Sequence, residues 1–230
     1  MTLVVDWTAG ALKRWTAFAC FGLTLFAQSR GHATGTPAVD ALPHSKSYLL
    51  TGNYVVGGVD LAPQSGGQGF VTGTIPMSGV PANADVLAAF LYWETISSVD
   101  AQVNGAEFRG QPLTAVKTSS LALNPTTAPC WSSGGGSGAT YTMTMFRADV
   151  LRLLPNQLDG NGRPTGKKLV NDTELLSNQM PLHTVRLPEA GTGNQVPSSA
   201  GGSLVVVYRD PMQALTQIVL LDGISVQAKG

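Results

Sequence analysis

Residues 86–93 read VLAAFLYW and residues 204–208 read LVVVY, two runs without a polar side chain other than the tyrosine hydroxyl. Turn-forming residues bound both runs, with Pro81 before the first and Asp210-Pro211 after the second. A short, continuous apolar run between turn signals is typical of a central strand that is covered on both faces. These two segments therefore predict the middle of a β-sheet with a packed layer above and below it.

The remaining pattern is also that of strands. Residues 140–146 alternate polar and apolar side chains, and Asn104-Gly105 is a strong signal for a hairpin turn. One helix is expected, over residues 147–154 before Pro155. Because helices that could connect parallel strands are missing, we expect an all-β antiparallel β-sandwich, jelly-roll-like, with about nine or ten strands. The other predicted strands are residues 69–75, 99–108, 113–118, 182–187 and 215–221.

The composition excludes some functions. The chain has 230 residues, of which 43% are hydrophobic, enough for a packed core. Only 12% are charged, and the 14 Lys and Arg residues balance the 14 Asp and Glu residues. Nucleic acids and anionic membrane surfaces bind proteins through an excess of positive charge. We therefore expect neither as a partner.

The N-terminus has the layout of a secretory signal peptide. Lys13 and Arg14 precede a largely apolar stretch, residues 15–27. Two possible cleavage sites with small residues follow, Leu25-Phe26-Ala27 and Gly31-His32-Ala33. The stretch is too short for a transmembrane helix. The residues before it suggest a start codon further downstream or a long basic region. The alternative is a buried N-terminal helix of a cytosolic protein.

This layout predicts the organisation and the location of the chain. We expect a signal peptide over residues 1–33, a flexible leader over 34–46 and one β-sandwich domain over 47–230, secreted or held at the cell surface. Cys20 lies inside the signal, and lipid attachment there is a weaker alternative. Cys130 is then alone, as a buried side chain or a reactive thiol, and no intrachain disulfide forms in the mature domain.

No catalytic constellation is found, and we expect a protein that is not an enzyme and needs no cofactor. The Gly134–Ala139 stretch lacks the following helix that a phosphate-binding loop requires. No G-x-S-x-G motif occurs, and Cys130 with His183 forms an unsupported pair. A hydrolase that uses Glu94 with an unidentified second acid is a further alternative.

Three residues are candidates for ligand binding. Trp131 lies in a Gly- and Ser-rich segment, where it could stack on a sugar ring or anchor the loop. Trp93 and Glu94 end the apolar run at residues 86–93, so an acid lies beside aromatic rings at the end of a strand. Their alternative interpretation is a strand-terminal charge that faces water.

Metal binding has weaker support. The turn at residues 159–162 does not fit an EF-hand, because Arg163, Pro164 and Val170 occupy its fifth, sixth and twelfth positions. A looser calcium site would use Asp159, Asn161 and Asp172, and a plain turn is the simpler interpretation.

Several short phrases occur in one order along the chain: Gly52-Asn53-Tyr54-Val55, Gly73-Thr74-Ile75-Pro76, Ala89-Phe90-Leu91-Tyr92-Trp93, Val103-Asn104-Gly105, Arg147-Ala148-Asp149-Val150 and residues 203–211. Together they resemble an uncharacterised class of secreted bacterial surface proteins built from β-sandwich modules. The resemblance lies in the order of the phrases, and it implies a fold and a location but no catalytic residues. Such modules usually continue further, so either the reading frame is truncated at the C-terminus or the final strands come from elsewhere.

The sequence thus predicts a non-catalytic secreted or cell-surface structural or adhesion-type module of unknown ligand. The alternative is a carbohydrate-binding or hydrolase-associated accessory domain. The expected partner is a cell-surface or extracellular component, carbohydrate among the candidates, and an unpaired sheet edge could pair with a strand of another domain.

Overall fold

A computed structural model describes residues 4–6, 42–62, 69–98, 105–123, 141–172, 183–191 and 195–224. Every strand pairing in it is antiparallel, which confirms the predicted all-β antiparallel class. The elements are β1 (Val4–Asp6), β2 (His44–Asp60), β3 (Phe70–Thr74), β4 (Asp85–Ser97), β5 (Glu107–Phe108), β6 (Gln111–Pro112), β7 (Ala115–Leu123), β8 (Tyr141–Asp149), the 3-10 helix η1 (Leu151–Leu153), β9 (Asn156–Leu158), β10 (Pro164–Lys168), β11 (Thr184–Pro188), β12 (Gly201–Arg209) and β13 (Leu215–Leu221).

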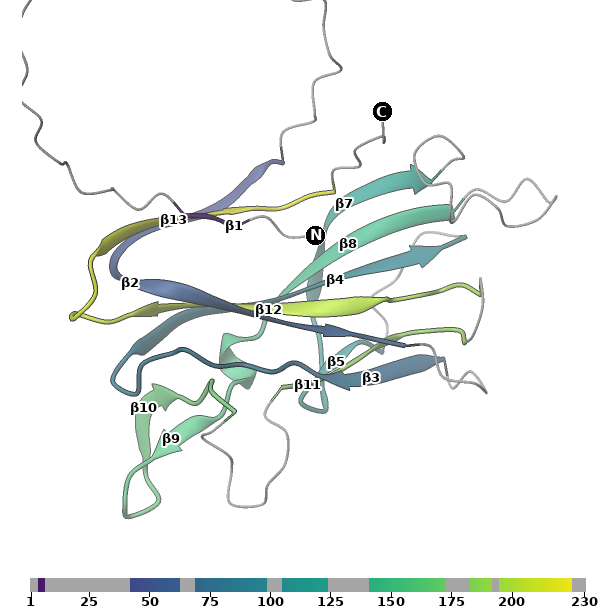
Figure 1. Cartoon of the computed structure of the whole chain (residues 1–230). Helices are drawn as coiled ribbons and strands as arrows, with labels where there is room; N and C mark the ends of the chain where they lie inside the picture. Colours follow the sequence, from purple (N-terminus) through teal and green to yellow (C-terminus); the bar gives the residue numbers. More distant parts are fainter. Residues whose placement is uncertain are drawn as a thin grey trace, which may run out of the picture.

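The strands form a curled large sheet, a small sheet and a hairpin. The large sheet has the order β1-β13-β2-β12-β4-β8-β7, the small one β3-β11-β5-β6, and β9 pairs with β10. The long strand β2 belongs to two layers, because its first part pairs with β13 and its second part, from Gly52 to Asp60, pairs with β12. Figure 1 shows β13 and the start of β2 above β12 and β4, with β3, β5 and β11 below.

Two hydrophobic cores lie on opposite faces of the central strands. Ala89, Leu91 and Trp93 of β4 pack into the larger core, together with residues of the small sheet. Ala88, Phe90 and Tyr92 alternate with them and pack into the smaller core, under Ile218 and Leu220 of β13. The prediction that the two continuous apolar runs are covered on both faces is confirmed, and the layering is that of a sandwich.

Two predictions for individual segments need correction. The helix expected over residues 147–154 is wrong: Arg147–Asp149 complete β8, since Arg147 and Ala148 pair with Tyr92 and Leu91 of β4. Only Leu151–Leu153 form a short 3-10 turn. In addition, β2 begins at His44, three residues inside the range assigned to a leader.

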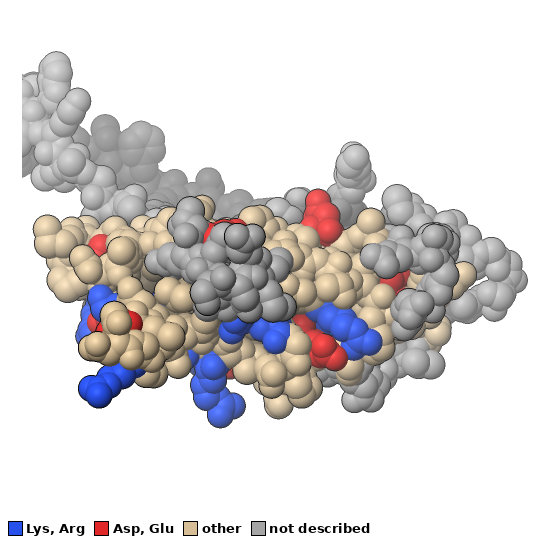
Figure 2. All heavy atoms as spheres, turned by 90° about the horizontal axis from the view of Figure 1, so that it is seen from below, with Lys and Arg blue, Asp and Glu red and all other residues tan. Residues whose placement is uncertain are grey.

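The lower face of the molecule carries few charges. Figure 2 shows this face as mostly uncharged, with Lys and Arg side chains beside Asp and Glu side chains. The small sheet follows this pattern, because Arg186 of β11 lies 3.0 Å from Glu107 of β5.

Several predictions fall outside the described residues. The apolar stretch of the predicted signal peptide, Cys20, Cys130 and Asn104 all lie there. Of the N-terminal segment, only β1 is described, and it pairs with the outer edge of β13. Within the described ranges, no helix has the length and apolar character needed to cross a membrane.

Candidate functional site

A hollow of about 300 Å³ lies where β2, β12 and β4 run side by side, near the ends of β2 and the start of β12. Of its lining residues, Tyr92 and Met145 belong to the smaller core, whereas Val59 and Trp93 pack with the larger core on the opposite face. A volume near 300 Å³ is at the lower end of the range for small-molecule sites. The lining residues are Gly58, Val59, Asp60, Tyr92, Trp93, Glu94, Met145, Ala200, Gly201, Gly202 and Ser203.

The strand register places two acids on either side of a glycine. Gly202 pairs with Val59 of β2 and with Trp93 of β4. One position further along each strand, Asp60 of β2, Gly201 of β12 and Glu94 of β4 therefore lie in one row across the sheet. Since neighbouring strands lie about 4.8 Å apart, the Cα atoms of the two acids are separated by roughly 10 Å. The hollow thus has a hydrogen-bond acceptor on each side and no side chain between them.

Glycines create the floor of the hollow. A Cβ atom added to Gly58 would meet nothing closer than the Ser203 hydroxyl oxygen at 3.6 Å, so the space above this residue is open. At Gly201 an added Cβ would lie 2.6 Å from the Val59 carbonyl oxygen, so glycine there allows β2 and β12 to approach closely. Gly58 is therefore a position at which a larger side chain would fill the hollow.

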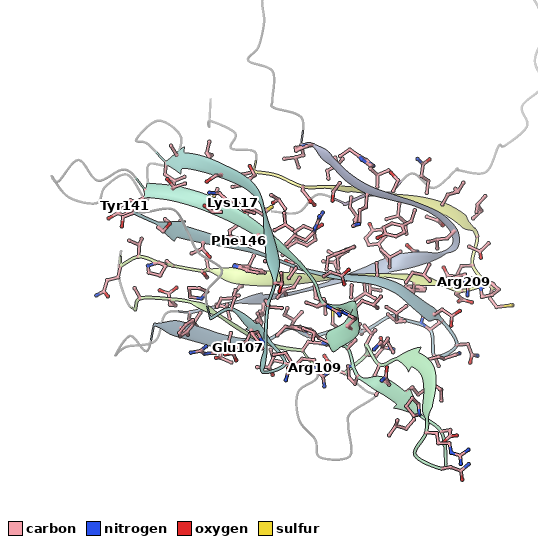
Figure 3. All side chains as sticks on the ribbon, turned by 180° about the vertical axis from the view of Figure 1, so that it is seen from behind. Glu107, Arg109, Lys117, Tyr141, Phe146 and Arg209 are labelled. Atoms are coloured by element: carbon pink, nitrogen blue, oxygen red, sulfur yellow. The ribbon has the colours of Figure 1, made fainter. Side chains whose placement is uncertain are left out.

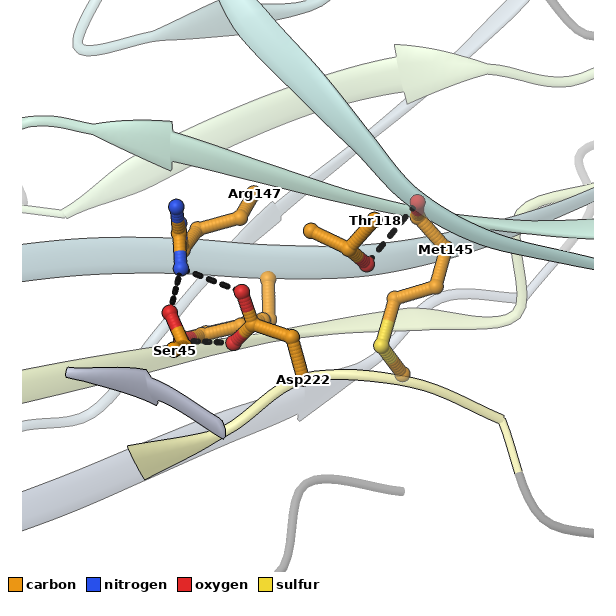
Figure 4. Close-up of polar contacts among 6 residues, drawn as sticks. Ser45, Thr118, Met145, Arg147 and Asp222 are labelled. Atoms are coloured by element: carbon orange, nitrogen blue, oxygen red, sulfur yellow. Dashed lines mark hydrogen bonds and ion pairs between the residues drawn. The ribbon is translucent and has the colours of Figure 1, made fainter. Parts of the chain in front are cut away.

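A polar network fixes one wall. The Tyr92 hydroxyl donates to Asp222 Oδ1 at 2.8 Å, and Arg147 bonds both Asp222 Oδ2 and the Ser45 hydroxyl (Figure 4). Burial raises the pKa of Tyr92 above its ordinary value, and the hydrogen bond to Asp222 raises it further. The phenol is neutral at physiological pH and remains a donor. The network joins the strands that line the hollow to the end of β13.

Of the three predicted ligand-binding residues, the side chain of Glu94 lies at the hollow and the ring of Trp93 is buried in the larger core. Glu94 is half-buried and lines the hollow. The ring of Trp93 is 3% exposed and stacks on Phe146 in the larger core, with centroids 5.3 Å apart, so it faces away from Glu94. Figure 3 shows Phe146 within the central sheet. Trp131 lies outside the described residues.

The residues of the proposed calcium site have backbone partners. Asp159 Oδ1 accepts the N–H groups of Asn161 and Arg163, both at 2.8 Å, and closes the β9–β10 turn. Asp172 Oδ2 accepts the N–H of Met77 at 2.9 Å. Among the residues that the structure describes, no group of three or more His, Cys, Asp and Glu side chains could hold a metal ion. The calcium site stays a prediction from sequence.

Sequence reasoning missed most of the hollow, including Asp60 and Ser203. The signal that could have found it is a pair of glycines inside each of two strands, at residues 57–58 and 201–202. Glycine within a strand marks a bulge or a place where a ligand or another backbone approaches closely.

His183, considered above as a base for Cys130, is a core residue. It is fully buried, its Nε2 bonds the Val170 carbonyl oxygen at 2.6 Å, and its ring stacks on Phe108. Burial lowers the pKa of His183, Arg109 lowers it further, and the Val170 bond and Asp172 act in the opposite direction. Its Nδ1 has no hydrogen-bond partner in the described part of the chain. The imidazole is thus held in its neutral form.

This placement predicts a dependence of stability on pH. The folded-state pKa of His183 lies below its ordinary value of about 6.5. The neutral imidazole therefore contributes its full share of the folding stability above about pH 6.5, and this share is lost as the pH falls below this value toward the folded-state pKa. We expect the melting temperature to drop between about pH 7.5 and pH 5, and His183→Gln to reduce that drop. His44→Gln, a change at an exposed imidazole, is the control. An unchanged drop in His183→Gln would contradict the prediction.

A comparison of the chain with protein-family models, curated proteins and solved structures found no match.

Proposed function

We propose that the chain is a non-catalytic, secreted or cell-surface β-sandwich module with a structural or adhesion-type role. The observation that carries this proposal is the hollow, which is built on the central strands of a sheet packed on both faces. Strands held by two cores form a rigid platform, and a rigid platform suits binding. The signal-peptide layout of the N-terminus supports export.

The edge of the large sheet at β13 is a second candidate surface for contact with a partner. In the structure β1 occupies the outer edge of β13, with Val5 paired to Val219. Removal of residues 1–33 on export would take β1 away and open this edge. An open edge offers backbone donors and acceptors to an extended segment, so we propose strand pairing with a neighbouring domain there.

A carbohydrate-binding or hydrolase-associated accessory role is the second candidate. It is favoured by Asp60 and Glu94, because ionised carboxylates only accept hydrogen bonds and sugar hydroxyls donate them. The ring of Trp93 is buried, so binding at the hollow would use acceptors more than ring stacking.

Sedimentation with insoluble envelope material tests the main proposal. We expect the purified full chain to co-sediment with bacterial cell-wall preparations, and Gly58→Leu to reduce the bound fraction because leucine fills the hollow. The matched control is Gly160→Leu, a position in the β9–β10 turn with no atom within 4 Å of an added Cβ. A chain that stays in the supernatant with every preparation would contradict an adhesive role.

A test for turnover separates the module from a hydrolase. We expect no release of reducing ends from the polysaccharides that the chain binds. Release that disappears in Glu94→Gln would show that the chain is a hydrolase and would refute the non-catalytic proposal.

A further inference from the structure

The hollow is open, and an acidic side chain lies at each of two sides. The open space above Gly58 lies beside Ser203, whose partners across the two neighbouring strands are Gly58 and Tyr92. Tyr92 and Met145 are each 2% exposed and supply a fixed base. Asp60 and Glu94 stand at the two sides. The size suits one ring of a sugar chain, which could enter and leave at the open end.

The charge of the hollow limits what it can hold. The residues that line the hollow include two with carboxylate side chains, Asp60 and Glu94, and no Lys or Arg. Ionised carboxylates accept hydrogen bonds and repel anions, so a ligand must present donors on opposite sides and carry no negative charge. Hydroxyl groups satisfy this demand, and an ammonium group satisfies it with an additional Coulomb attraction.

We infer that the hollow is a subsite for a single non-anionic pyranose unit of a polysaccharide, with Asp60 and Glu94 as acceptors for its hydroxyl or amino groups. Amino sugars bind more tightly than neutral sugars, and uronic acids are excluded. This inference rests on the proposal that the chain is a binding module, and it names the class of ligand for the hollow.

Three probes of equal length test the charge preference: the tetramers of glucosamine, glucose and a uronic acid. We expect calorimetry with the full chain to show the glucosamine tetramer bound about tenfold more tightly than the glucose tetramer at low salt. We expect no binding of the uronide. Added salt should reduce the difference between the first two, because screening weakens Coulomb attraction.

Variants test whether the preference for the glucosamine tetramer arises at the hollow. Gly58→Leu should weaken binding of the glucosamine tetramer about tenfold or more, and Gly160→Leu should leave it unchanged. Asp60→Asn and Glu94→Gln keep the shape and remove a charge, and together they should bring the glucosamine and glucose affinities within about twofold of each other. Asp85→Asn, a change at an exposed acid near the start of β4, is the charge control. Melting curves of each variant verify folding.

The outcomes separate this inference from the proposal beneath it. Uronide binding as tight as that of glucosamine, or a preference that survives Asp60→Asn with Glu94→Gln, would overturn the subsite. The same holds if no tetramer binds while the chain still co-sediments with cell-wall material, and in that case the module proposal stands. Absence of both tetramer binding and co-sedimentation overturns the inference and the module proposal together.

Discussion

Replacement of Asp222 with alanine is expected to lower the free energy of unfolding by about 3 kcal/mol, which is the usual cost of removing one partner of a buried ion pair. The Asp222 carboxylate accepts hydrogen bonds from both Tyr92 and Arg147. The Arg147 and Asp222 side chains are 18% and 10% exposed. Alanine leaves the Arg147 guanidinium and the Tyr92 hydroxyl without this acceptor. Urea denaturation followed by tryptophan fluorescence measures the change.

An exposed ion pair provides the matched control. Arg209 and Asp85 lie 2.7 Å apart with side chains 54% and 46% exposed, and Figure 3 places Arg209 at the far end of the sheet from Tyr141. Exposed pairs contribute little to stability, so Asp85→Ala should leave the denaturation midpoint nearly unchanged. If Asp222→Ala shifts the midpoint no more than Asp85→Ala does, the buried network does not hold β13 over the smaller core.

The Gly52→Ala variant is expected to lose about 3 kcal/mol of stability, at the upper end of the cost of overpacking. Gly52 is the residue at which β2 changes partner from β13 to β12. An added Cβ would lie 2.2 Å from the carbonyl oxygen of Tyr208 and 2.9 Å from the Cα of Arg209, both backbone atoms. The backbone must therefore shift where the two layers join. Thermal unfolding and the yield of soluble protein report the loss.

Gly58→Ala in the same strand is the control for this prediction. Its added Cβ makes only ordinary contacts, and alanine is favoured over glycine within a strand by about 0.5–1 kcal/mol. We expect stability equal to or above that of the parent chain. Equal losses in the two variants would mean that the close approach at Gly52 does not control folding.

Apolar periodicity predicted the central layer well. Residues 215–221 form β13 with the predicted bounds, and the runs at 86–93 and 204–208 lie inside β4 and β12. The pattern failed for β2, because Gly52 and residues 57–58 interrupt its apolar side chains. It also failed at residues 147–154, where pairing of Arg147 with Tyr92 outweighs local helix propensity. The number of strands exceeds nine or ten because of short pairs such as β9 with β10. The jelly-roll topology stays a prediction.

The candidate site was predicted in part. Glu94 could be found from its position directly after an apolar run. The expectation that it ends the strand was wrong, because β4 continues to Ser97 and Glu94 is half-buried within it. Asp60 could not, because only the pairing of β2 with β12 brings it beside Glu94, and that pairing joins distant parts of the chain. Local patterns contain no information about which strands become neighbours across such a separation.

The two roles of β2 also set the order of events during synthesis. Among the described strands, β2 pairs with β12 and β13, the last two in the chain. A nascent chain that has not yet reached Gly201 therefore carries a long strand with neither of its neighbours. The large sheet therefore cannot be completed before translation has passed Leu221. On the export route proposed above, such a delay would keep the polypeptide unfolded during its passage through a narrow translocation pore.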